Sequence, residues 1–138
     1  MWLLTSLAKL QWLVPLVLRA AVGVSFFLFH GLDKVYPGGE WDFGQKFASK
    51  GAAPAVLMYV AAWTEFLGGF ALLLGVLTRW AAIGLLGVMV YAIFVVHGSD
   101  PYAKRELAIA YAAALSVIAI RGPGQVSLDR LFFGKQAL

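Results

Sequence analysis

The sequence predicts an all-α integral membrane protein, a four-helix bundle in an antiparallel up-down-up-down arrangement. Hydrophobic residues make up 62% of the 138 residues and charged residues 13%, whereas a soluble domain has roughly 45–50% and about 25%. A chain of this length cannot bury so much apolar surface within itself. Glycine, tryptophan and tyrosine are also abundant, as is typical of helical membrane proteins. We therefore expect a single transmembrane domain over residues 1–138, covered by a lipid bilayer.

Four apolar stretches are long enough to be membrane helices, and they cover residues 10–29, 55–77, 80–96 and 107–120. The fourth stretch is the shortest, so Lys104, Arg105 and Arg121 must reach from its ends to the membrane surface. The link between the second and third stretches is very short, which predicts a helical hairpin. A long loop over residues 31–54 joins the first two stretches, and part of it is expected to form a short amphipathic helix at the interface.

Composition and charge exclude several classes of function. The chain has no cysteine, which excludes disulfide scaffolds, iron–sulfur clusters and thiolate nucleophiles. The net charge of +4 comes from scattered basic residues, which favours contact with a membrane surface and not with nucleic acid. Lysine and arginine are divided equally between the two sides, but the side that holds both termini has fewer acidic residues. Both termini are therefore predicted to be cytoplasmic.

Two charged residues, Arg19 and Glu65, fall near the middle of the first and second predicted spans. A charge at the bilayer centre costs at least roughly 2.5–3.5 kcal/mol when it is unpaired. We therefore expect Arg19 and Glu65 to face inward as an ion pair on neighbouring antiparallel helices. Such a pair either fixes the register of the helices or belongs to a ligand-binding or proton-transfer site.

A polar funnel is predicted above this pair. Arg19, Gly23, Phe26 and His30 follow helical spacing and share one stripe of the first span. The connectivity also places His97 and Glu106 at the membrane side where His30 lies. The two histidines and Glu106 lack the close spacing of a metal site, so no metal is predicted. A haem between His30 and His97 is geometrically conceivable but is not favoured.

Four motifs follow one another along the chain: Arg19-x3-Gly23-x2-Phe26-x3-His30-Gly31-x2-Lys34, Glu65-x2-Gly68-Gly69-x2-Leu72-x2-Gly75-x2-Thr78-Arg79, Glu106-x4-Tyr111, and Gly122-Pro123-Gly124-x2-Ser127-Leu128-Asp129. In these motifs the chain resembles the DoxX family of small bacterial and archaeal membrane proteins, over nearly its whole length. The positions that match the family pattern are Arg19, His30, Lys34, Glu65, Arg79 and Glu106.

The resemblance implies a four-helix bundle in the bacterial or archaeal cytoplasmic (inner) membrane, with both termini in the cytoplasm. The family takes its name from a subunit associated with thiosulfate:quinone oxidoreductase and terminal quinol oxidase systems. The first functional hypothesis is therefore a quinone-interacting accessory subunit of a membrane oxidoreductase. Its electrons would come from a redox partner protein, since the chain has no cysteine and no evident cofactor motif.

In this hypothesis Glu65 and His30 have proton-transfer roles, and Arg19 either holds Glu65 ionised or polarises an anionic semiquinone. The ligand-binding residues are predicted to be Arg19, Glu65, His30, Lys34, His97 and Glu106. The alternative hypothesis is a non-enzymatic membrane module that binds, carries or senses a small solute or lipid, or scaffolds a complex. A homo-oligomer is compatible with both hypotheses.

Overall fold

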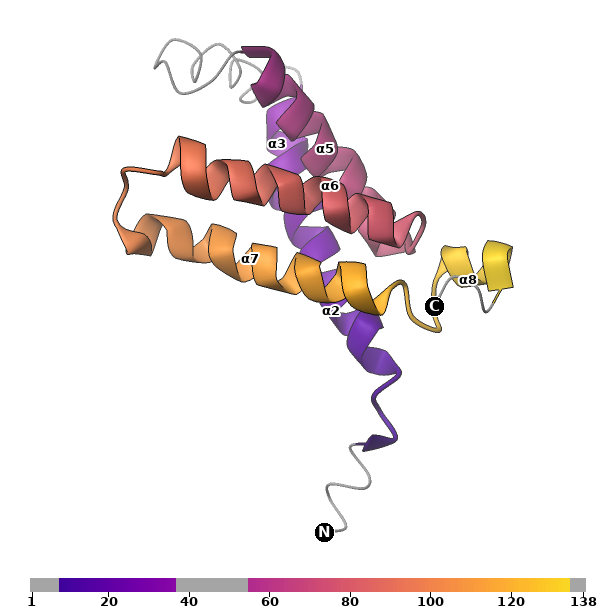
Figure 1. Ribbon diagram of the computed structural model, residues 1–138. Coiled ribbons are helices and arrows are strands. Elements are labelled where there is room, and N and C mark those ends of the chain that lie inside the picture. The colour runs from indigo at the N-terminus through magenta and orange to yellow at the C-terminus, as the bar shows by residue number, and fades with distance from the viewer. Residues whose placement is uncertain (1–7, 37–54, 135–138) are drawn as a thin grey trace.

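The computed structural model describes residues 8–36 and 55–134, and the regular secondary structure within these ranges is helical (Figure 1). The elements are α2 (Leu13–Val24), the π-helical segment η1 (Ser25–Gly31), α3 (Leu32–Val35), α5 (Ala55–Leu74), α6 (Thr78–Tyr91), the π-helical segment η3 (Ala92–Val96), α7 (Tyr102–Arg121) and α8 (Leu128–Phe133).

The first span is longer than the sequence predicts. Helices α2, η1 and α3 follow one another without a break, so the helix does not end at residue 29 but continues to Val35. Within η1 the hydrogen bonds skip one residue more than in an α-helix, as in the bond from the Leu32 N–H to the Phe27 carbonyl. Because each of these hydrogen bonds encloses one residue more than in an α-helix, the helix face shifts, which α-helical spacing alone does not predict. The amphipathic helix expected in the following loop falls largely on residues outside those described.

Three segments among the described residues are long and apolar enough to cross a membrane: Leu13–Val35, Val56–Leu74 and Thr78–Val96. The fourth predicted span lies within α7, which has the length of a span but also contains Lys104, Arg105, Glu106 and Arg121 near its ends. These charges explain why α7 is not among the segments that are apolar enough to cross a membrane.

Each long helix packs against its neighbours in the chain, and the last also packs against the first. Helix α5 contacts α2 and η1 on one side and α6 on the other, while α7 contacts α6 and α2. Figure 1 shows α6 and α7 running side by side as a hairpin that lies across α2 and α5. The up-down-up-down order relative to a bilayer stays a prediction.

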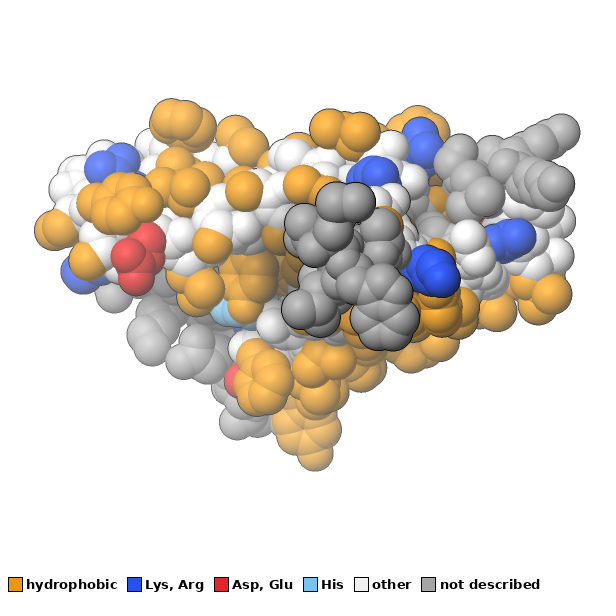
Figure 2. Space-filling view, turned by 90° about the horizontal axis from the view of Figure 1, so that it is seen from below, with side chains coloured by type: hydrophobic (Ala, Val, Ile, Leu, Met, Phe, Trp, Pro, Cys, Tyr) orange, Lys and Arg blue, Asp and Glu red, His pale blue; other side chains and the backbone are white. Residues whose placement is uncertain are grey.

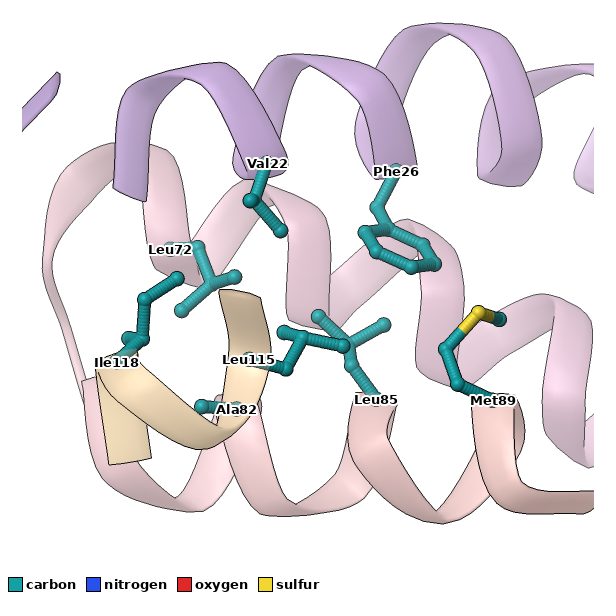
Figure 3. Packing of buried hydrophobic residues seen from close by; sticks show 8 residues of the cluster. All are labelled: Val22, Phe26, Leu72, Ala82, Leu85, Met89, Leu115 and Ile118. Carbon is teal, nitrogen blue, oxygen red and sulfur yellow. The ribbon is translucent and has the colours of Figure 1, made fainter. Parts of the chain in front are cut away.

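The core lies where these helices meet (Figure 3). All four long helices contribute side chains to one buried cluster, in which Phe26, Leu72, Leu85 and Leu115 are fully buried. Their side chains point from the four helices toward a common centre. Elsewhere many large apolar side chains are exposed, as expected for a protein whose outer surface faces lipid.

The contact between the first helix and α5 depends on glycine. A Cβ atom added to Gly69 would overlap the backbone of Phe27, and one added to Gly31 would overlap the backbone of Phe66. Small residues of this kind allow two membrane helices to approach closely. The two glycines therefore fix the register of the first helix against α5.

Substitution of Gly69 by alanine is expected to destabilise the protein by about 1–3 kcal/mol, because the added methyl group meets backbone that cannot move independently. Gly87 is the matched control, since a Cβ added there meets no atom within 4 Å apart from its chain neighbours and the backbone of its own helix. The Gly87→Ala variant should be unchanged or slightly more stable, because alanine favours the helix. Thermal unfolding in detergent compares the two variants, and equal midpoints would contradict this assignment.

Candidate functional site

The two charges inside the predicted spans, Arg19 and Glu65, are both buried, with 2% and 3% of their surface exposed. The predicted ion pair between them is wrong. The Glu65 carboxylate pairs with the Lys34 ammonium group, and the Arg19 guanidinium donates to the carbonyl of Val126. The α2–α5 register explains this, because it brings Arg19 beside Gly75 at the end of α5 and Lys34 beside the middle of the same helix.

The first polar cluster, here called the Glu65 site, consists of Glu65, Lys34, His30 and Tyr111. Lys34 lies in α3 and Glu65 in α5, and the side chain of Lys34 is 18% exposed whereas that of Glu65 is 4% exposed. The close approach at Gly31, three residues before Lys34, allows the ammonium group to reach a carboxylate inside the core. The ion pair is therefore more accessible from its Lys34 side.

His30 joins this cluster from the π-helical segment. Its ring contacts Tyr111 of α7 edge to face, with the ring centroids 5.6 Å apart and an interplanar angle of 87°. It also lies 5.5 Å from the ring of Phe26. Lys34 and Asp33 are the charged groups close enough to act on the imidazole. An imidazole, an ammonium group and a carboxylate thus come together among aromatic rings.

The second polar cluster, here called the Asp129 clamp, consists of Arg19, Gly75, Val126 and Asp129. Gly75 has a positive φ of 68°, and a Cβ atom there would overlap the Arg19 guanidinium. Only glycine therefore allows Arg19 to lie against the turn between α5 and α6. The guanidinium in turn holds the segment after α7 through the Val126 carbonyl.

Asp129 closes the clamp by capping a helix that starts about fifty residues earlier. The N–H groups of Leu77 and Thr78, at the start of α6, donate to the two carboxylate oxygens of Asp129 at 2.6 and 2.8 Å. The Asp129 N–H donates to the Gly75 carbonyl at 2.8 Å. A helix N-terminus favours a carboxylate for its charge and its acceptor atoms. The clamp therefore fastens the C-terminal segment onto the α5–α6 turn.

The remaining predicted site residues, His97 and Glu106, do not join His30. His97 Nδ1 lies 2.8 Å from the Asp100 carboxylate in its own turn. This hydrogen bond, with help from Lys104, lowers the pKa of Asp100 below its ordinary value. Glu106 is exposed. Among the described residues neither His97 nor Glu106 forms a hydrogen bond, ion pair or ring contact with His30 or Glu65, so the predicted funnel is not assembled as expected.

The side chains of the Glu65 site support a limited range of chemistry. Among the described residues no group of three or more His, Asp and Glu side chains is arranged to hold a metal ion. The Glu65 site offers donors at His30, Lys34 and Tyr111, and one carboxylate that can exchange a proton. These groups can bind and polarise a carbonyl-bearing ligand.

Sequence comparison decides the family. A sequence model of the DoxX family matches residues 14–98, which cover nearly all of the first three spans and include Glu65. The chain belongs to the DoxX family. An uncharacterized protein of Haemophilus influenzae is 35% identical to this DoxX protein over 125 residues, covering 86% of this chain and 90% of the relative. No solved structure matches the chain.

The sequence predicted Glu65, Lys34 and His30, which the structure brings together, as candidate site residues. It did not predict the Asp129 clamp. Gly75 and Asp129 were both part of the family-like motifs of this DoxX protein, yet they are far apart in sequence and neither motif indicates the other. The sequence feature that could have indicated the clamp is Asp129, the acidic residue that follows the Gly-Pro-Gly turn at 122–124. A buried acid at that place needs donors, and the start of α6 supplies them.

Removing the Asp129 carboxylate should destabilise the protein. The Asp129→Ala variant leaves the Leu77 and Thr78 N–H groups without their acceptor, at a cost of about 2–3 kcal/mol. Asp33→Ala serves as the control because Asp33 is exposed, and its effect should stay within about 0.5 kcal/mol. Thermal unfolding measures both, and an Asp129 variant as stable as the Asp33 variant would refute the clamp.

The ion pair can be tested with a double-mutant cycle. Lys34→Met leaves Glu65 buried without its countercharge and should cost about 3 kcal/mol, and Glu65→Leu should likewise destabilise the protein. The combined variant removes both charges and should recover most of the lost stability. Additive losses in the double variant would show that the two side chains do not act as a pair.

Proposed function

We propose that this DoxX protein is a quinone-interacting subunit of a membrane oxidoreductase system, and that the quinone headgroup binds at the Glu65 site. The observation that carries the proposal is a buried carboxylate paired with a partly exposed ammonium group, with an imidazole beside it. Ionisable groups within membrane spans are costly, which favours a functional role for them.

The chemistry of quinone reduction fits these side chains. A quinone that takes up two electrons also takes up two protons to become a quinol. Lys34 can donate a hydrogen bond to one carbonyl oxygen, and His30 can donate a second hydrogen bond. Glu65 can pass a proton toward the bound ring and regain it by way of the partly exposed Lys34 side. The electrons come from a partner protein, since the chain has no cysteine.

The direct experiment is a binding titration. Purified protein in nanodiscs is titrated with a short-chain quinone, and the dissociation constant is measured. Glu65→Gln and His30→Ala are each expected to weaken binding about tenfold or more, because each removes a polar partner of the headgroup.

Matched controls come from the two polar residues that stand apart from this site. Glu106→Gln and His97→Ala change the same residue types as the test variants and should leave the dissociation constant unchanged. Unchanged binding in both test variants, or equal losses in the controls, would refute the proposal.

A second candidate is the non-enzymatic module that binds an apolar molecule. It is favoured by a groove of about 630 Å³ between α5 and α6, whose lining includes Trp63, Gly68 and Trp80. The Thr64 hydroxyl in this groove already donates to the Val60 carbonyl at 2.7 Å, so it offers little to a polar headgroup. Binding of an alkyl chain without any affinity for quinone would support this second function.

A further inference from the structure

We propose that the end of the molecule near the Asp129 clamp binds an anionic phospholipid. The headgroup site is a pocket of about 480 Å³ where the start of α2, the start of α6, the end of α7 and the following turn come together. Its charged and polar lining residues are Arg79, Arg121, Gln11 and Gln125. Trp12 and Pro15 close it on the α2 side.

The two arginines are available to an anion. Both Arg79 and Arg121 are exposed, and neither forms an ion pair or a hydrogen bond with any described residue. Two guanidinium groups on one pocket repel each other unless an anion lies between them. A phosphate diester fits two such groups, because a guanidinium can donate paired hydrogen bonds to phosphate oxygens.

The acidic residues do not neutralise this pocket. Among the described residues, Asp129 is the acid at this end of the helices, and its carboxylate is already bound by the Leu77 and Thr78 N–H groups. Figure 2 shows several basic side chains in the half of the molecule where α7 ends, whereas the acidic side chains in view lie in the opposite half. The local charge is therefore positive and unpaired.

Arg79 is also unfavourable for the helix that carries it. It lies in the first turn of α6, where the helix dipole is positive and disfavours a cation. Arg121, at the last residue of α7, is favoured by that helix end. Helix stability alone does not explain an arginine at position 79. A ligand that binds both Arg79 and Arg121 does explain it.

A separate apolar groove of about 390 Å³ runs along α2. It is lined by Leu13, Val14, Val17, Leu18 and Ala21, which are adjacent in the helix to Trp12 and Pro15 of the headgroup pocket. From Leu13 to Ala21 the helix rises about 12 Å. A basic pocket at the start of a helix that exposes apolar side chains, such as Val14 and Val17, matches an amphiphile with an anionic head and an alkyl chain. Basic pockets between membrane helices are typical sites for such lipids.

The test is lipid binding by the purified full chain, measured by native mass spectrometry. The protein in detergent is titrated with phosphatidylglycerol and, separately, with phosphatidylcholine. We expect the anionic lipid to bind more tightly, and Arg79→Gln and Arg121→Gln each to weaken its binding about tenfold. Because either variant alone tests the pocket, misfolding of one leaves the other informative.

Arg130→Gln is the matched control, because it removes the same charge at the same end of the molecule outside the pocket. It should leave phosphatidylglycerol binding unchanged. Inorganic phosphate should fail to displace the lipid. Three results would overturn the proposal: equal affinity for the two lipids, equal losses in Arg130→Gln and the pocket variants, or displacement by phosphate, which would indicate a site for free anions.

Discussion

The requirement that every charge inside an apolar protein find a partner organises this molecule. Arg19 and Glu65 are both almost completely buried, and neither can be left unpaired in an apolar environment without a large cost. The fold meets this requirement twice, with different partners. Lys34 supplies a countercharge for Glu65, and the segment after α7 supplies a carbonyl acceptor for Arg19. Each pairing fixes one contact between segments that are distant in sequence.

The two buried charges lie in polar clusters that differ in their accessibility. At the Asp129 clamp, the carboxylate accepts from the start of α6, and one guanidinium nitrogen of Arg19 donates to the Val126 carbonyl, so these groups hold backbone. At the Glu65 site the ion pair stays open on the Lys34 side and has an imidazole nearby. This difference is why we assign structure to the first cluster and ligand chemistry to the second.

The sequence predicted the helical membrane class, the approximate spans and the buried charges, because these depend on local composition and period. It did not predict the partners. Helical spacing placed Arg19 and His30 on one stripe, but the π-helical segment Ser25–Gly31 changes that face, and backbone hydrogen bonding of this kind leaves no clear pattern in side chains. The Asp129–Thr78 contact joins residues 51 positions apart. Only the packed structure reveals it.

The separation of the two buried charges is the central claim, and amide hydrogen exchange tests it most directly. Exchange is measured in the protein with Arg19→Gln and, separately, with Glu65→Gln. Arg19→Gln is predicted to raise exchange at the Thr78 and Asp129 amides, because the clamp loses its guanidinium, while Glu65→Gln leaves both amides protected. If Glu65→Gln raised exchange at Thr78 and Asp129 as much as Arg19→Gln, the two charges would belong to one network and the account would be contradicted.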